Sequence, residues 1–270
     1  MDYFMLKKED LASNSRIPIV ILGDAGEVFY EMALDMINHI KANNAAGKET
    51  VFICPVGPVG QYPIFVRLVN EQKVSLKNVW FFNMDEYLTD EDTYIDIDHG
   101  LSFRGFMNRT VYNQILPELV MPPEQRVFPD PANPVALDEK LAALGGAQVC
   151  YGGIGITGHL AFNEPEEVSV EEFAQRPTRI LDISAETRAV NSIGDLGGAV
   201  AAMPHRCITI GMKSILEAKE LRLYCFRDWH RAVVRQAGYG EISASFPVTL
   251  AQNHPDARIT ITKNVAEAAY

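Results

Sequence analysis

The sequence predicts an α/β fold: a single domain with a doubly wound, mostly parallel sheet that carries helices on both faces, in a Rossmann-like arrangement. Apolar runs typical of buried parallel strands alternate with segments of helical periodicity along most of the 270 residues. Several of these runs end in unusual loops, and no internal repeat interrupts the alternation. We therefore expect one domain over residues 1–270, with residues 1–14 as an irregular or helical arm.

Each element is predicted from its own local pattern. Asp24 is suited to cap a helix that runs to about Asn43, because apolar side chains recur behind it at helical spacing. Ser102 is expected to cap a second long helix, which ends at Leu116. Residues 89–100 are acidic and polar, as expected of a mobile loop or lid. Strands are expected at residues 17–22, 50–54, 79–83, 147–153, 180–183, 207–210, 221–226 and 259–262, and further helices at 62–71, at 135–144 and from 184 onward.

Composition restricts the partners. The formal net charge of −11 argues against nucleic acid and against an anionic membrane surface, although a basic pocket on an acidic protein still admits an anionic small molecule. The N-terminus lacks the apolar run of a signal peptide and no stretch is long enough to span a bilayer, so we expect a cytoplasmic protein. The widely spaced cysteines are interpreted as buried thiols rather than disulfides or a metal site: Cys54, Cys150, Cys207 and Cys225.

Residues 149–165, VCYGGIGITGHLAFNEP, carry most of the functional signal. An apolar strand breaks into a glycine-rich turn that lets the backbone approach a ligand, and His159 and Glu164 follow at once. Asp85 comes directly after another expected strand, and the loop at residues 55–60 after a third. Because parallel strands end at one edge of a sheet, we expect these three loops to converge on one crevice.

The side chains that collect there suit proton transfer. An imidazole that titrates near neutrality, beside separate carboxylates, can move protons next to a carbonyl group. Metal binding is the rival chemistry, because the same residue types are ligands, but the spacing lacks the His-Glu-x-x-His pattern and no second histidine lies nearby. We expect no metal and no cofactor, since no dinucleotide fingerprint is present either.

Two motifs resemble a known family. GGIGITGHLAFNEP at residues 152–165 and FFNMDEY at residues 81–87 are similar to the two signatures of the glucosamine-6-phosphate deaminase/isomerase family. Weaker matches at residues 186–188 and 191–192 extend the resemblance over most of residues 15–265. The resemblance implies a cofactor-free reaction in which an amino sugar phosphate, such as glucosamine 6-phosphate or galactosamine 6-phosphate, isomerises to a ketose and releases ammonia.

The resemblance also implies residue roles. The position of Asp85 corresponds to the base that moves a proton between C2 and C1, and that of His159 to the group that opens the sugar ring, assisted by Glu164. The family has an aspartate where this chain has Thr157, so a carboxylate partner of the histidine is missing. We therefore name Asp85, His159, Glu164 and Thr157 as catalytic candidates.

The phosphate end departs further from the family. An arginine that contacts the phosphate is replaced by Ile193, a lysine aligns with His230 or Arg231, and the 55–60 loop has two prolines and no hydroxyl side chain. Either another basic residue, such as Arg227, substitutes, or the substrate is not the usual one. The candidates for substrate binding are Gly57, Val59, Gly60, Gly155, Gly158, His230 and Arg231.

Two further functions stay open. The first is a sugar-phosphate-binding regulator, although no basic helical pair precedes the core. The second is a hydrolase similar to the sugar-phosphate lactonases, which share a glycine–histidine loop; the Asn-Met-Asp-Glu-Tyr motif favours the deaminase instead. For each enzyme we expect a small phosphosugar as substrate, and we expect a homo-oligomer.

Overall fold

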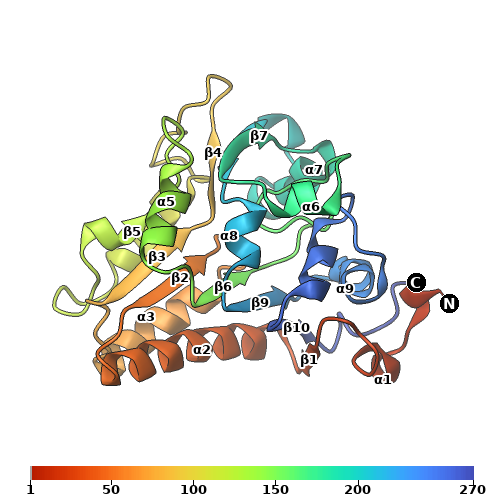
Figure 1. The fold of residues 1–270 in the computed structure, drawn as a ribbon, viewed down its shortest axis with the longest axis horizontal. Helices are drawn as coiled ribbons and strands as arrows, with labels where there is room; N and C mark the ends of the chain where they lie inside the picture. The colour runs from red at the N-terminus through yellow and green to blue at the C-terminus, as the bar shows by residue number, and fades with distance from the viewer. Residues whose placement is uncertain (1) are drawn as a thin grey trace.

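A computed structural model describes residues 2–270, and it confirms the predicted fold class. Its main sheet has seven strands in the order β1-β10-β9-β6-β2-β3-β5, and all neighbouring pairs are parallel (Figure 1). The bounds are β1 (Ile19–Leu22), β2 (Thr50–Cys54), β3 (Val79–Asn83), β5 (Arg126–Val127), β6 (Val149–Gly152), β9 (Glu220–Cys225) and β10 (Ala257–Thr262).

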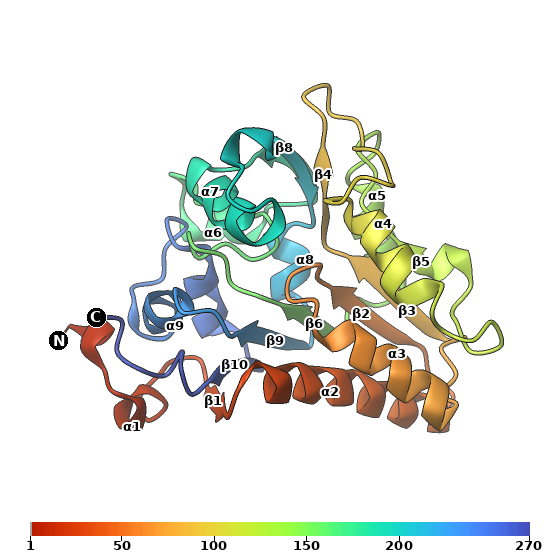
Figure 2. The ribbon, with the colours of Figure 1, turned by 180° about the vertical axis from the view of Figure 1, so that it is seen from behind.

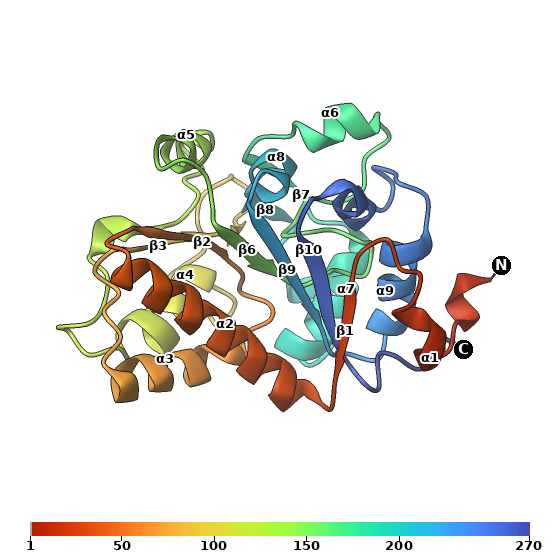
Figure 3. The ribbon, with the colours of Figure 1, turned by 60° about the horizontal axis from the view of Figure 1, so that its bottom comes forward.

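Helices cover both faces of this sheet (Figure 3). Strand side chains alternate between two cores, as the pleat of a strand requires. Phe52 and Phe81 pack on the face covered by α2 (Ala25–Ala45) and α3 (Gln61–Gln72). Ile53 and Phe82 pack on the other face, against α5 (Ala136–Ala143), α8 (Met212–Leu216) and α9 (His230–Tyr239). The sheet is therefore doubly wound, and its edges rather than its faces remain open to ligands.

The predicted caps are confirmed, but one helix is shorter than expected. The Asp24 carboxylate accepts a hydrogen bond from Glu27 N at 3.0 Å, and Ser102 caps α4 (Phe103–Met107) in the same way. Instead of reaching Leu116, α4 gives way to a π-helix at Asn108–Tyr112. A π-helix advances by a smaller angle per residue, so the adjacent side chains of Val111 and Tyr112 both reach the core.

A second, three-stranded sheet was not predicted. Its strands are β4 (Asp85–Leu88), β7 (Arg179–Asp182) and β8 (Arg206–Thr209), antiparallel in the order β4-β8-β7. The expectation that β7 and β8 belong to the parallel sheet is therefore wrong. Only Met84 separates β3 from β4, so the chain leaves the main sheet at Asn83 and enters the second one at once. Figure 2 shows this sheet standing over the carboxyl edge of the main sheet.

The remaining elements connect these layers. The arm contains a 3-10 turn at Tyr3–Met5 and α1 (Lys8–Leu11), and the second sheet is flanked by α6 (Val170–Ala174) and α7 (Ala185–Asp195). Further 3-10 turns lie at Pro123–Gln125, Val200–Ala202 and Pro247–Asn253. Within residues 2–270, no helix has both the length and the apolar character that crossing a membrane requires. The four cysteines are free and buried.

A buried arginine fastens the arm to the end of the chain. The N- and C-termini lie side by side (Figures 1 and 3), and Arg235 of α9 is fully buried between them. Its guanidinium donates to Leu6 O at 2.6 Å and to Ala266 O at 2.8 Å. These bonds satisfy carbonyl groups that have little access to water.

We predict that Arg235→Met lowers the free energy of unfolding by about 2–4 kcal/mol, because it leaves several buried carbonyl oxygens without a donor. Urea denaturation of both proteins at pH 7 measures this difference. Arg231→Gln is the matched control, since Arg231 lies on the same helix and its guanidinium hydrogen-bonds to Asn264 near the surface. It should change the value by less than about 1 kcal/mol. Equal effects of the two substitutions would contradict the structural role of Arg235.

Candidate active site

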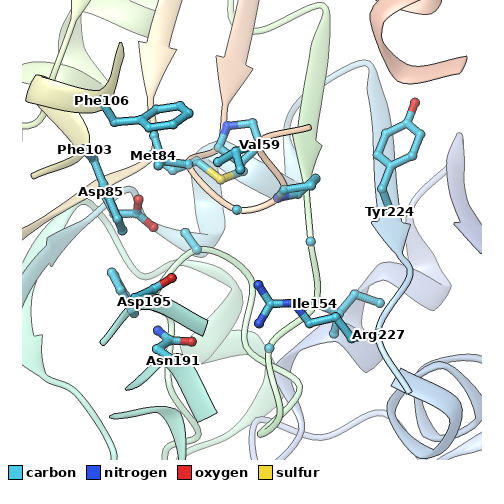
Figure 4. Close-up of a pocket in the computed structure, with 18 of the residues that line it drawn as sticks. Val59, Met84, Asp85, Phe103, Phe106, Ile154, Asn191, Asp195, Tyr224 and Arg227 are labelled. Carbon is cyan, nitrogen blue, oxygen red and sulfur yellow. The ribbon is translucent and has the colours of Figure 1, made fainter. Parts of the chain in front are cut away.

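A cavity of about 500 Å³ opens at the carboxyl edge of the main sheet (Figure 4). Its walls come from the loops that follow β2, β3, β6 and β9, which confirms the predicted convergence and adds a fourth loop. The β2 loop and the β6 loop touch: a Cβ placed on Gly153 would lie 3.1 Å from Gly57 O. The strand order reverses between β2 and β6, so the cavity lies at the switch point where doubly wound sheets bind ligands.

Asp85 is the first residue of β4 and projects into this cavity (Figure 4). Its side chain is nearly buried, and no other side chain within residues 2–270 donates a hydrogen bond to it. Burial raises the pKa of Asp85 well above the ordinary aspartate value, and the charge of the adjacent Glu86 adds to the effect. A carboxylate of this kind is a stronger base than an exposed one.

Glu86 has a structural role beside it. The carboxylate of Glu86 is fully buried and accepts hydrogen bonds from Ser102 Oγ, Phe103 N and Arg104 N at 2.9–3.0 Å. It also forms an ion pair with the Arg104 guanidinium at 3.2 Å. Glu86 thus anchors the start of α4, whose aromatic side chains Phe103 and Phe106 line the cavity next to Asp85.

His159 lines the same cavity from the β6 loop. The imidazole lies directly against Gly155, where a Cβ would be 2.0 Å from His159 Nε2. Only glycine leaves room for the ring at this position. The Gly155 amide also donates to His159 O at 2.9 Å, so this turn fixes both the backbone and the ring of His159.

The Thr157 hydroxyl lies between the imidazole and a carboxylate. Thr157 Oγ1 is 2.9 Å from His159 Nδ1 and donates to Glu164 Oε2, also at 2.9 Å. Since a hydroxyl has one proton to donate, it accepts the second bond, and His159 therefore carries its proton on Nδ1. In the neutral ring Nε2 is then the nitrogen without a proton, and no side chain or backbone group among the described residues is hydrogen-bonded to it. Thr157 thus fixes the tautomer, a task that a carboxylate commonly performs.

Glu164 lies behind His159 rather than in the cavity, so the prediction that Asp85, His159 and Glu164 share one pocket is wrong for Glu164. Its Oε2 is 3.6 Å from His159 Nδ1, and with Thr157 it lines a separate hollow of about 400 Å³. Burial alone would raise the pKa of Glu164, but the hydrogen bond from His159, the positive charge that His159 carries when protonated, and hydrogen bonds from Thr187 and Thr157 outweigh it and lower the pKa to about 2. Glu164 is therefore an ionised support for the histidine.

The predicted glycine and valine positions lie mostly where expected. Gly57, Val59, Gly60 and Gly155 line the cavity. Gly158 does not: it turns the chain at a φ of +78°, and its Cα faces Phe246, which a Cβ would meet at 2.6 Å. Its role is conformational rather than substrate binding.

The two predicted basic positions do not supply a cation to the cavity. His230 lines the wall, but its Nδ1 accepts from Arg227 N at 2.9 Å and its Nε2 lies 3.1 Å from Ile154 O. Burial lowers the pKa of His230 to about 3, so this ring is neutral and fully engaged. Arg231 does not line the cavity and instead contacts Asn264. The expectation that either residue replaces a phosphate-binding lysine is not supported by their surroundings.

Several lining residues could not be identified from the sequence. Asn191 and Asp195 reach the cavity from α7, and Phe29 reaches it from α2. Arg227 and Phe226 come from the β9 loop. In the sequence, only the Asn191-Ser192 match and the basic residue Arg227 indicated the side of the cavity that α7 and the β9 loop form. Across residues 2–270, no three histidine, cysteine, aspartate or glutamate side chains gather as a metal site would require.

Comparisons with known proteins place these observations in a family. No family model matches the chain. A glucosamine-6-phosphate deaminase of Porphyromonas gingivalis is 30% identical over 218 residues, which cover 79% of each chain. Among solved structures, a monomeric glucosamine-6-phosphate deaminase superimposes with a TM-score of 0.79 at 23% identity, over 92% of this chain and 98% of the other. A 6-phosphogluconolactonase from Trypanosoma cruzi has a TM-score of 0.66 at 16% identity, over 92% and 95%, and shares the fold.

The Glu164 carboxylate predicts a pH-dependent contribution to stability. Its folded pKa of about 2 is below the ordinary value of 4.5, so its contribution is complete above pH 4.5 and is lost as the pH falls toward 2. We expect Glu164→Gln to lower the free energy of unfolding at pH 7 by roughly 3 kcal/mol. The deficit should shrink as urea denaturation is repeated from pH 7 to pH 3. Glu167→Gln, at an exposed position of the same loop, is the control; a pH-independent deficit for Glu164→Gln would contradict this electrostatic role.

Proposed function

The chain belongs to the glucosamine-6-phosphate deaminase family, and we propose that it catalyses the isomerisation and deamination of a 2-amino sugar by acid–base chemistry. One observation carries the proposal: His159, whose Nε2 has no hydrogen-bond partner among the described residues, and the Asp85 carboxylate line one cavity from two different loops. Thr157 sets the tautomer of His159, and burial raises the pKa of Asp85, so the two groups are controlled separately. The site therefore provides two independent proton-transfer groups, as a two-stage reaction of this kind requires.

Ring opening is assigned to His159. Its free Nε2 accepts the proton of the hydroxyl at C1 and returns it to the ring oxygen, so that the bond between C1 and the ring oxygen breaks and an aldehyde forms. The positive charge that the ring carries between these events is stabilised through Thr157 by the ionised Glu164. The Thr157 hydroxyl is hydrogen-bonded to both residues, so the negative charge of Glu164 stabilises the ring while the Glu164 carboxylate itself stays outside the cavity.

Isomerisation is assigned to Asp85. Its carboxylate removes the proton from C2, the electron pair forms a C1–C2 double bond, and the π bond of the C1 carbonyl group breaks toward its oxygen, which takes a proton from water. The same C2 proton is then returned to C1 while the nitrogen lone pair forms a double bond to C2. The nitrogen then remains at C2 as an imine, which takes up water and releases ammonia and a ketose. A buried carboxylate with a raised pKa suits the first step, because its basicity approaches that required at neutral pH.

The relatives' names specify a 6-phosphate, and glucosamine 6-phosphate and galactosamine 6-phosphate are accordingly among the substrates to test. The chemistry assigned above involves only C1, C2 and the ring oxygen. It is therefore the same for a phosphorylated and for an unphosphorylated amino sugar.

The experiment that tests the proposal is ammonia release from glucosamine, galactosamine and their 6-phosphates, by the wild type and by Asp85→Asn. We expect release by the wild type and a loss of roughly 10²–10⁴-fold in kcat for the variant, because it lacks the base. Asp85→Asn should also be more stable than the wild type at pH 8 but not at pH 4. A raised folded pKa means that the ionised form destabilises the fold at high pH, and asparagine cannot ionise.

The outcomes separate the proposed function from its structural neighbour. Absence of ammonia from all four sugars, together with hydrolysis of 6-phosphogluconolactone that survives Asp85→Asn, would contradict the deaminase and favour a lactonase. Lactone hydrolysis needs one base to activate water and no transfer between carbons, so it does not need Asp85.

A second prediction concerns the Thr157 hydroxyl. Thr157→Val keeps the shape of the side chain but removes the hydrogen bonds to His159 and Glu164, so the imidazole loses its fixed tautomer. We expect kcat for ammonia release to fall at least tenfold with little change in KM, because the step affected is proton transfer. Thr157→Ser is the matched control and should retain most of the activity. Equal losses in the two variants would assign Thr157 a packing role only.

A further inference from the structure

The cavity has little positive charge. Among its lining residues the acids are Asp85 and Asp195, and burial raises the pKa of both. The histidines are His159 and His230, and the guanidinium of Arg227 is the one permanent positive charge that the described lining residues supply. His230 is neutral, because its pKa is lowered by burial and both nitrogens are engaged. A phosphate monoester brings a charge of about −1.5 to −2. It would therefore enter a site that offers one permanent cation and two carboxyl groups.

Helix α3 does not compensate for this deficit. The N-terminus of a helix can bind an anion through free N–H groups, but two of the first three residues of α3 have none to offer. Tyr62 N already donates to Val59 O at 3.1 Å, and Pro63 has no N–H to donate. The Phe29 ring lies against Gly60, where a Cβ would meet the ring at 2.3 Å, so an aromatic face covers the entry to the helix.

The loop before α3 is also apolar on its cavity side. Val56, Pro58 and Val59 line the wall where a phosphate would need hydroxyl or amide donors, and Val59 is 38% exposed. Phe29 and Phe226 continue this wall as an edge-to-face pair with ring centroids 4.8 Å apart. Aromatic and aliphatic groups of this kind pack against the carbon skeleton of a ligand rather than against an anion.

Arg227 and Asp195 bring a hydrogen-bond donor and a hydrogen-bond acceptor to the cavity, and their charges are opposite when Asp195 is ionised. Both project into the cavity, one from the β9 loop and one from the end of α7 (Figure 4). No ion pair or hydrogen bond joins them. The Arg227 guanidinium lies over the Phe226 ring, 5.9 Å from its centroid, and it forms no ion pair with any of residues 2–270. Separated in this way, one group can donate to a hydroxyl oxygen and the other can accept a hydroxyl proton.

We propose that the substrate of this cavity is an unphosphorylated amino sugar, whose neutral hydroxyl groups bind between Arg227 and Asp195 while its carbon skeleton packs on the apolar wall. The amino-sugar class rests on the proposed function. The absence of phosphate rests on the charges and donors of the cavity itself. The relatives' names specify a 6-phosphate, so this inference separates the chain from them in substrate rather than in chemistry.

The test is calorimetric titration of the full chain with 2-amino-2-deoxyglucitol and with its 6-phosphate. Neither alditol has an aldehyde, so neither can react, and binding is measured independently of turnover. We expect the neutral alditol to bind at least tenfold more tightly than the phosphorylated one. Tighter binding of the phosphorylated alditol would overturn the inference, as would failure of both to bind at 10 mM. Glucosaminuronate is a third probe: tighter binding of this carboxylate than of the neutral alditol would overturn the inference in favour of an anionic sugar.

Variants locate the effect in the cavity. Arg227→Gln should weaken the neutral alditol about tenfold, whereas Arg231→Gln, outside the cavity, should change nothing. If Arg227→Gln instead weakens only the phosphorylated alditol, Arg227 is a phosphate ligand and the inference fails.

The ammonia assay distinguishes this inference from the proposed function. Preferred binding of the neutral alditol without ammonia release from any sugar would leave the inference standing and remove the deaminase function. Ammonia release together with preferred binding of the phosphorylated alditol would support the deaminase function and overturn the inference that the substrate is unphosphorylated.

Discussion

The hydroxyl of Thr157, held between His159 and Glu164, is the interaction on which the geometry of the site depends. The same carboxylate that receives the Thr157 proton accepts a second bond, from Ser184 Oγ at 3.1 Å. Ser184 is the N-cap of α7, so the line of hydrogen bonds that orients the imidazole also fixes the start of this helix. The far end of α7 brings Asn191 and Asp195 to the cavity. One hydrogen-bond network, through Thr157, Glu164 and Ser184, therefore fixes both the orientation of His159 and the position of α7 at the cavity.

The second sheet explains how a carboxylate comes to be buried at this edge. Asp85 pairs with Thr209 of β8, and this antiparallel ladder holds it under the loops that close the cavity. An ionised carboxylate in such a place is unfavourable unless it is paired, and no side chain within residues 2–270 pairs with Asp85. The adjacent Glu86, by contrast, is saturated with donors and anchors α4. The two neighbouring acids are thus distinguished by environment: one is stabilised as a structural anion, and the other remains reactive.

The sequence predicted the parts of the fold that have a local signal. Strands β2 and β3 match their expected bounds, because each is a continuous apolar run, and Asp85 and His159 were found because parallel strands end at one edge. Strand β4 was missed because its partner β8 lies more than a hundred residues away and leaves no local trace. His230 was selected correctly as a lining residue but assigned the wrong role. Its neutrality follows from burial and from hydrogen bonds to backbone groups, which no pattern of residue types records.

The two ends of the cavity respond differently to change in the sequence. The proposed proton transfer depends on a few atoms at fixed distances, and the hydroxyl of Thr157 supplies one of these contacts, to His159 Nδ1. Recognition of the rest of the sugar depends instead on the balance of charge over a wide surface. There, Val56, Pro58 and Val59 contribute apolar side chains to the wall and supply no proton-transfer group. The residues assigned to proton transfer therefore agree with the reaction of the family, whereas the residues around the rest of the sugar do not indicate the phosphorylated substrate of the family.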